Sequence, residues 1–367
     1  MPTPRIIIAI SLLAAFLCNC RHKTETGTYG METVISEQRD GYVCHLIEFD
    51  TEPGERIRGY LLVPDRASAT CKVPAVVMLH DHGARFDIGK EKLVRPIQTE
   101  TASCTVPGHI AKSAEQWAGK YFDGIFFGDL LASEGFAVIV ADALYWGERS
   151  SPEAREWSRL TFGDTGTSGP ERKDSLKQKI RNLKQTVYEG QRDVYAGFED
   201  KGDCWAEKIL RDDIATAGLI SSMPFVDTSR VHAFGFSMGA HRCWLLSAFC
   251  DRIKRGAAVC WMTEKQSYDS DNASDLSMRI PSMRDTMDFP DIARLTRPKP
   301  MLFINGAEDP LFPKETVRKA FNRMQAEYSG CPPGTLRTYF VPGGHHCGTA
   351  VQDSVLQFFS DIAVRRK

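Results

Sequence analysis

The segment Gly235-Phe236-Ser237-Met238-Gly239 has the residue types of a nucleophilic serine held on a sharp turn. It lies between a β-strand pattern at residues 231–236 and a helical pattern at residues 238–250. Such a strand-to-helix turn lifts a serine hydroxyl clear of the sheet, and its glycines allow close backbone approach. The following helix offers N–H groups, beginning with Met238, to an oxygen that gains negative charge. We therefore expect Ser237 to be a nucleophile; the alternative is a glycine-rich turn with an idle serine.

A nucleophilic serine needs a base, and the base needs an orienting carboxylate. On a strand–turn–helix scaffold the acid and then the base follow the serine along the chain. Asp309 follows an apolar strand pattern at residues 300–305, and His345 follows two glycines after the strand pattern at residues 335–341. We expect Asp309 to orient His345, with His346 as the alternative base. Glu308 competes with Asp309, and either carboxylate could instead cap the next helix.

The loop His80-Asp81-His82-Gly83-Ala84-Arg85 directly follows an unbroken apolar strand pattern at residues 75–79. A second N–H donor for an oxyanion is expected from a loop at this place. His82 and Arg85 are the candidates, alongside Met238. Two histidines and an aspartate are also metal-ligand types, but no third ligand cluster with suitable spacing accompanies them. We therefore expect neither a metal nor a cofactor.

Strand patterns alternate with helical patterns through most of the chain, which predicts an α/β fold with a mostly parallel sheet and helices on both faces. Residues 42–49 and 57–63 alternate apolar and polar side chains around a Pro-Gly turn, which predicts an antiparallel hairpin at the sheet edge. We expect one domain at residues 41–367. Two insertions, near residues 85–125 and 148–203, follow strands whose loops would overhang the serine; the second is expected to carry one helical stretch, near residues 172–195.

The first twenty residues differ from the rest. One arginine and an apolar run of about a dozen residues have the form of a secretory leader, too short for the roughly 20 apolar residues of a membrane-spanning helix. The end of this run, Leu17-Cys18-Asn19-Cys20, resembles a loose bacterial lipobox, which implies a lipid on Cys20. We expect residues 21–40 to be a linker and the protein to be secreted, periplasmic or an outer-membrane lipoprotein. A plain signal peptide and an uncleaved anchor are the alternatives.

The composition excludes some classes of function. The chain has 367 residues, 42% of them apolar, and 46 basic residues balance 47 acidic ones. This balance leaves no surplus charge to neutralise a phosphate backbone, so no nucleic-acid partner is expected. Nine cysteines remain after the leader, an odd number that cannot pair fully. Cys243, Cys250 and Cys260 stand in apolar patterns and are expected to be small buried side chains.

The motifs HDHGA, GFSMG, NGAEDP and PGGHH, in this order, resemble those of the α/β-hydrolase superfamily. Within it, LHDHGARFDIGKEK and the strand end Cys260-Trp261-Met262-Thr263 are most similar to the dienelactone hydrolase-like and acetyl xylan esterase-like branch. The resemblance spans about residues 40–363. It implies the α/β-hydrolase fold, a triad of Ser237, Asp309 and His345, and an ester substrate. Dienelactone hydrolases proper use a cysteine nucleophile, so Ser237 favours general carboxylic esters.

These observations together predict a secreted or surface-tethered serine esterase, with acetyl esters of carbohydrates as the expected substrates. Its partner would be a small-molecule or oligosaccharide ester, with membrane contact only through a lipid on Cys20. The aromatic side chains near the insertions could stack on a sugar ring or pack among themselves; they are Trp117, Tyr121, Tyr145, Trp146 and Trp157. The alternatives are a peptidase on the same fold and a non-catalytic carbohydrate-binding surface protein.

Overall fold

The computed structural model describes residues 29–98, 106–163 and 170–360. The expected leader and Cys20 lie outside the described residues. Within the described ranges, no helix combines the length and the apolar character that crossing a bilayer requires.

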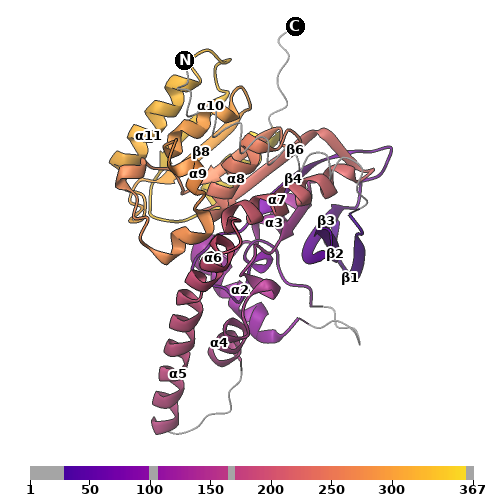
Figure 1. Cartoon of the computed structure of the whole chain (residues 1–367). Helices are drawn as coiled ribbons and strands as arrows, with labels where there is room; N and C mark the ends of the chain where they lie inside the picture. Colours follow the sequence, from indigo (N-terminus) through magenta and orange to yellow (C-terminus); the bar gives the residue numbers. More distant parts are fainter. Residues whose placement is uncertain (1–28, 99–105, 164–169, 361–367) are drawn as a thin grey trace.

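A nine-stranded sheet forms the centre of the molecule, in the order β1-β2-β3-β5-β4-β6-β7-β8-β9 (Figure 1). Strands β1, β2 and β3 are antiparallel, β3 also pairs antiparallel with β5, and all later pairs are parallel. The strand bounds are β1 Glu32–Arg39, β2 Tyr42–Glu52, β3 Glu55–Pro64, β4 Val73–Leu79, β5 Ala137–Ala141, β6 Val226–Phe236, β7 Arg255–Val259, β8 Met301–Gly306 and β9 Leu336–Val341. The mostly parallel sheet with an N-terminal antiparallel hairpin is therefore confirmed.

Strand β1 corrects one expectation, because residues 21–40 were expected to form a linker. Glu32–Arg39 instead pairs along β2 as the edge strand of the sheet. Only Ile35 and Arg39 in this strand are buried, so the alternation of apolar side chains that marks a strand is missing. Backbone pairing with β2, which sequence patterns do not display, is what makes this segment a strand.

Helices cover both faces of the sheet. Val77 of β4 packs in a core with α7, α8 and α11, whereas its neighbours Val76 and Met78 pack in a second core with α3 and α12. This division follows from the alternation of side chains along a strand. The helix bounds are α2 Gly108–Tyr121, α3 Phe127–Ser133, α4 Pro152–Phe162, α5 Pro170–Glu189, α6 Gln191–Glu199, α7 Trp205–Ser222, α8 Met238–Phe249, α9 Pro281–Arg284, α10 Ala293–Thr296, α11 Lys314–Glu327 and α12 Thr349–Ser360.

The second insertion is more helical than its charged, glycine-containing sequence suggests. Instead of one helical stretch it contains α4, α5 and α6, and α5 extends away from the body of the molecule (Figure 1). Helix α4 begins with Ser151 as its N-cap and Pro152 at its first position, a combination that favours a helix start. Helix α4 packs against α2 of the first insertion. The two insertions therefore meet on one side of the sheet.

Candidate active site

Ser237 lies between β6 and α8 in a backbone conformation that side-chain-bearing residues rarely adopt, with φ 54° and ψ −124°. The turn is possible because both neighbouring glycines lack a side chain. A Cβ on Gly235 would lie 1.8 Å from the carbonyl oxygen of Gly239, and a Cβ on Gly239 would lie 1.9 Å from that of Leu79. This is the sharp turn that the motif predicts. Such strain is typical of functional sites, where the surrounding structure maintains it.

Backbone hydrogen bonds hold the turn in place. The N–H of Ser237 donates to the carbonyl of Val259 on β7 at 2.8 Å, and the Ser237 carbonyl accepts from the N–H of Ala240 at 2.7 Å. Met238 is the first residue of α8, and an N–H at that position has no intrahelical acceptor. It can therefore donate to an oxygen beside the serine, as the sequence predicts.

Asp309 and His345 meet at the carboxyl ends of β8 and β9. His345 Nδ1 lies 2.8 Å from Asp309 Oδ2, and Asp309 Oδ1 accepts from the N–H of Leu311 at 2.9 Å. Because Asp309 is a carboxylate acceptor, the hydrogen bond assigns the proton to Nδ1 and leaves Nε2 as the basic nitrogen. The imidazole packs against Phe236, the residue before the serine, with ring centroids 4.9 Å apart. Serine, imidazole and carboxylate are thus gathered at one edge of the sheet.

Glu308, the competing carboxylate, binds the backbone of the histidine loop instead. Its side chain accepts from the N–H of Gly343, and its own N–H donates to the Gly343 carbonyl at 2.9 Å. The two loops touch closely, because a Cβ on Gly306 would lie 2.0 Å from the Gly344 carbonyl oxygen. Glu308 therefore fixes the position of the loop, and Asp309 is the carboxylate that contacts the imidazole.

His346, the alternative base, points to a different partner. The Nε2 atom of His346 lies 3.2 Å from Oδ1 of Asp123, a residue that follows the end of α2. The His346 side chain is 37% exposed. Asp123 also accepts from the N–H of Thr349 at the start of α12. His345 is thus the histidine that pairs with Asp309, whereas His346 ties its loop to the first insertion.

Cys260 lies beside this pair, a position that sequence reasoning missed. Its Sγ is part of a group with ligand atoms of Asp309 and His345 that all lie within 4.8 Å of one another. Burial, followed by the charge of Asp309, raises the pKa of the thiol to about 12, which disfavours the thiolate that zinc prefers. Cys260 is buried, as expected, and its position after β7, next to the serine-bearing β6, was the available signal of closeness to the site.

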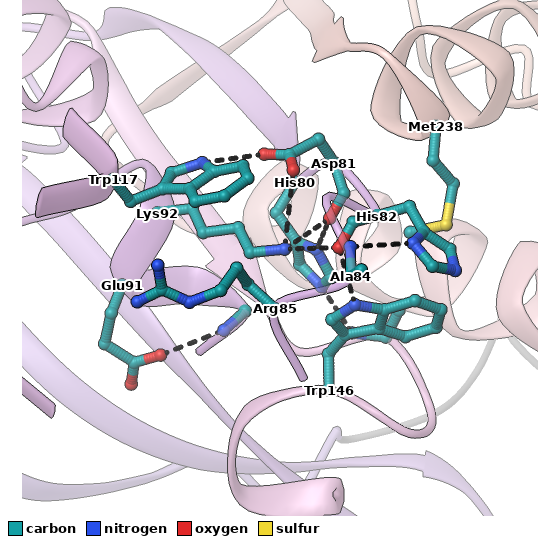
Figure 2. A network of polar contacts seen from close by, with 12 residues as sticks. His80, Asp81, His82, Ala84, Arg85, Glu91, Lys92, Trp117, Trp146 and Met238 are labelled. Atoms are coloured by element: carbon teal, nitrogen blue, oxygen red, sulfur yellow. Dashed lines mark hydrogen bonds and ion pairs between the residues drawn. The ribbon is translucent and has the colours of Figure 1, made fainter. Parts of the chain in front are cut away.

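The loop after β4 is held by its own side chains and by side chains from other segments (Figure 2). His82 Nδ1 accepts from the N–H of Ala84 at 3.0 Å, so Nε2 carries the proton and donates to Gln191 of α6 at 2.7 Å. Burial lowers the pKa of His82 to about 4, so the imidazole is neutral near pH 7. Because both ring nitrogens are occupied, the backbone N–H is the group that His82 can offer to an oxyanion.

Arg85, the other candidate from this loop, does not suit that role. Its N–H donates to the His82 carbonyl at 3.3 Å. Its guanidinium bonds to Ser113 of α2 and lies 5.3 Å from the centroid of Trp157 and 4.8 Å from that of Phe162. Arg85 joins the two insertions, and sequence reasoning could not find this because Ser113, Trp157 and Phe162 come 28 to 77 positions later in the chain.

The aromatic side chains considered for sugar stacking are largely buried. Trp117 is 3% exposed and donates to Asp81 at 3.1 Å, and Trp146 is fully buried and donates to the His82 carbonyl at 3.1 Å. Trp157 is also buried, against Arg85. These rings support the loop after β4 and do not form an exposed platform. By contrast, Leu311 lies two residues after Asp309 and donates its N–H to that carboxylate. Its side chain is 62% exposed, so it is an apolar group at the rim of the site.

Comparisons with known proteins agree with this architecture. No family model matches the chain. The proposed hydrolase YtaP of Bacillus subtilis is 23% identical over 334 residues, which cover 89% of this chain and 91% of that protein. A proposed acetyl xylan esterase from Bacteroides fragilis has a TM-score of 0.56 at 16% identity, covering 89% of this chain and 74% of that one. A glucuronoyl esterase from Solibacter usitatus also has a TM-score of 0.56, at 11% identity, and the match covers 90% of this chain and 85% of that one. The chain therefore has the α/β-hydrolase fold.

Proposed function

We propose that this protein is a serine hydrolase that cleaves carboxylic esters. The observation that carries the proposal is the strained turn at Ser237 together with the 2.8 Å contact between His345 and Asp309 at the same edge of the sheet. The hydrolase and esterase names of the similar proteins support the same class of reaction. A strained serine beside an oriented imidazole is the arrangement that acyl transfer requires.

The proposed reaction uses these groups in two half-reactions. Ser237 Oγ attacks the ester carbonyl carbon while His345 Nε2 accepts the hydroxyl proton. The N–H groups of Met238 and His82 stabilise the negative oxygen of the tetrahedral intermediate. The carbonyl then re-forms, and the imidazolium returns its proton to the departing alcohol. Water repeats the sequence on the acyl-enzyme, and Asp309 keeps Nδ1 protonated and oriented throughout.

The substrate proposal is an ester with a small acyl group, such as an O-acetyl group on a carbohydrate. Its support is the likeness to proteins named for esters of carbohydrates and the resemblance of LHDHGARFDIGKEK to the acetyl xylan esterase-like branch. The buried tryptophans of the insertions do not contribute to this proposal. The exposed Leu311 offers an apolar contact for the ester at the rim.

A fluorophosphonate probe tests the nucleophile, because it reacts covalently with an activated serine. The wild-type chain should be labelled and Ser237→Ala should not be. Ser270→Ala, which changes an exposed serine, is the matched control and should be labelled like the wild type. Labelling that persists in Ser237→Ala would overturn the assignment of the nucleophile.

A series of p-nitrophenyl esters tests the acyl group. The acetate should be cleaved faster than the butyrate and the octanoate. One methylene group that a pocket accommodates poorly changes the rate by about 10–200-fold, so the preference should be measurable. Faster cleavage of the octanoate would indicate a long apolar acyl site and contradict the acetyl proposal. Cleavage of a dipeptide p-nitroanilide in preference to all esters would favour the peptidase alternative.

Export and lipidation of the chain are also proposed, on the form of residues 1–20 alone. Metabolic labelling with palmitate in a bacterial host should mark the wild-type chain and not Cys20→Ala. Cys71→Ala, at an exposed position, is the control and should retain the label. Recovery of an unlabelled wild-type chain in the soluble periplasmic fraction would instead favour a plain signal peptide.

A further inference from the structure

Two lysines are completely buried near the loop that follows β4. They flank Glu91 in the short 3-10 helix η1, Lys90–Lys92, and both are 0% exposed. A buried ammonium group is costly unless hydrogen bonds and charges compensate for the water that it loses. The partners of each lysine therefore show what its burial achieves.

Lys92 binds the backbone of the loop. Its Nζ donates to the carbonyl oxygens of Asp81 at 2.7 Å and His82 at 2.9 Å, and it lies 3.5 Å from Asp81 Oδ2 (Figure 2). The ring of Trp117 closes over the ammonium, with Nζ 5.0 Å from its centroid. The shortest contacts of this cation are thus two adjacent carbonyl dipoles and not a carboxylate.

Each of these carbonyls shares a peptide unit with the N–H of the next residue, and for the Asp81 carbonyl that N–H is the candidate oxyanion donor of His82. The Asp81 carbonyl and the His82 N–H belong to one planar unit, and the His82 carbonyl and the Gly83 N–H belong to the next. In a trans peptide the N–H points away from the C=O, so both N–H groups point away from Lys92. A cation bound to the oxygen also polarises the unit and strengthens its N–H as a donor.

The same loop is also held against the serine turn. Arg242 of α8 donates to the His80 carbonyl at 3.2 Å and forms an ion pair with Asp213 at 2.7 Å. Gly239 approaches Leu79 so closely that a Cβ would not fit. Consecutive carbonyls of the loop are therefore bound by buried cations while the loop adjoins the first turn of α8.

We propose that Lys92 is a positioning residue of the oxyanion hole: by binding the carbonyls of Asp81 and His82, it directs and polarises the N–H of His82 toward the oxygen of the tetrahedral intermediate. This inference depends on the proposed esterase function. It assigns Lys92 no contact with the substrate, and its effect passes through the peptide unit. The transition state, in which the oxygen is charged, should depend on Lys92 more than the bound ester does.

Lys90 is the internal comparison. It is equally buried, but its Nζ binds carboxylates, namely Asp142 at 2.8 Å, Glu148 at 2.8 Å and Glu91 at 2.9 Å. Loss of its charge should reduce stability, as for any broken buried ion pair, without altering the two loop carbonyls. Lys90→Met therefore separates the general effect of a missing buried charge from the specific effect proposed for Lys92.

The experiment compares Lys92→Met and Lys92→Gln with Lys90→Met and the wild type, using p-nitrophenyl acetate. Rates are expressed per active site, counted by fluorophosphonate labelling, so that a smaller folded fraction does not count as lost catalysis. Removal of a direct oxyanion donor costs about 10²–10³ in kcat, so we expect a loss of about 10–100-fold for Lys92→Met, with KM little changed. Lys92→Gln, which keeps N–H donors without the charge, should be intermediate, and Lys90→Met should keep kcat within a few-fold.

A second measurement reports on the oxyanion directly. A trifluoromethyl ketone forms a negatively charged tetrahedral adduct with the serine, whereas the corresponding alcohol binds without one. Affinity for the ketone should fall in Lys92→Met by the same factor as kcat/KM, and affinity for the alcohol should not. Normal kcat per active site in folded Lys92→Met or, if that variant does not fold, in Lys92→Gln would overturn the inference. Absence of wild-type labelling at Ser237 would instead overturn the proposed function itself.

Discussion

At the scale of single residues, the site depends on glycines at positions where a Cβ atom would not fit. Gly239→Ala would put a Cβ 1.9 Å from the Leu79 carbonyl oxygen, so the turn and the loop after β4 must separate. We expect a loss of stability of about 1–3 kcal/mol, typical of overpacking, together with a loss of at least about 10-fold in kcat/KM. Chemical denaturation and ester hydrolysis measure the two effects.

Gly119→Ala is the matched control for this substitution. Gly119 is an exposed residue of helix α2, and a Cβ there would meet nothing within 4 Å. Alanine in a helix should therefore stabilise by about 0.5–1 kcal/mol and leave hydrolysis unchanged. Equal behaviour of the two variants would contradict the close packing inferred at the serine turn.

Adjacent carboxylates at the end of β8 should have unequal effects on catalysis. Asp309→Asn should reduce kcat by about 10⁴, because an amide no longer stabilises the imidazolium and favours the wrong tautomer of His345. Glu308→Gln keeps an oxygen that can accept from the Gly343 N–H, so its loss should be much smaller. Steady-state kinetics on p-nitrophenyl acetate measure both, and a larger loss in Glu308→Gln would reverse the assignment.

The sequence predicts Ser237, Asp309 and the histidine pair as one candidate site, because each follows a strand and the carboxyl ends of these strands lie at the same sheet edge. It could not decide between His345 and His346. Neighbouring residues in a loop point in different directions, and here one contacts Asp309 while the other contacts Asp123. That choice depends on the path of the loop and not on local pattern.

At the scale of elements, the loop after β4 should respond to acid through His82. Burial lowers the pKa of His82 to about 4, from about 6.5 in an unfolded chain. Between these values the unfolded state binds a proton that the native state excludes, so stability is complete above pH 6.5 and falls as the pH falls toward 4. This one imidazole accounts for up to about 3 kcal/mol of that loss.

Urea denaturation at several values between pH 4.5 and 7 measures this dependence. The variant His82→Asn removes the titrating group, so its stability should fall less steeply with acid than that of the wild type. The other buried histidines are present in both proteins and cancel in the comparison. Parallel curves for the two proteins would show that His82 does not titrate differently in the folded and unfolded states.

Elements with apolar periodicity were predictable, and elements stabilised by distant partners were not. Strands β4, β8 and β9 and helix α8 match their patterns within a few residues. Strand β1 escaped notice because its side chains are mostly exposed and its pairing with β2 is a backbone property. The sequence underestimates the helical content of the second insertion, because its charged residues hide the apolar periodicity. These charged residues lie on the exposed faces of the helices.

At the scale of the whole molecule, the polar groups around the site come from segments far apart in the chain and are joined by buried contacts. Lys92 reaches back to Asp81, Gln191 of α6 holds His82, and Arg242 of α8 holds His80. None of these links has a local sequence signature, because each depends on how the sheet and the insertions assemble. The fold class could thus be inferred from the sequence and candidate reacting groups could be named from it, whereas the contacts that support the loop after β4 could not.

Arg85 makes the two insertions one unit, and this predicts a long-range effect of its loss. Its guanidinium lies 5.6 Å from the ring of Trp117 on α2 and 5.3 Å from that of Trp157 on α4. Arg85→Ala would remove these contacts and the bonds to Ser113, leaving Asp87 with fewer partners. We expect a loss of about 2–4 kcal/mol, because a buried charge network is broken, and faster hydrogen exchange in α2 and α4 together.

Arg159→Ala provides the comparison, because it removes an exposed cation from the same helix α4. Arg159 pairs with Glu156 at the surface, where water screens the two charges and the pair contributes little to stability. Its loss should change exchange only near its own turn of α4. In Arg85→Ala, the released Trp117 should also loosen Asp81, so ester hydrolysis should weaken although the substituted side chain donates nothing to the substrate. If hydrogen exchange in Arg85→Ala increased in α4 alone, contacts other than those of Arg85 would hold the two insertions together.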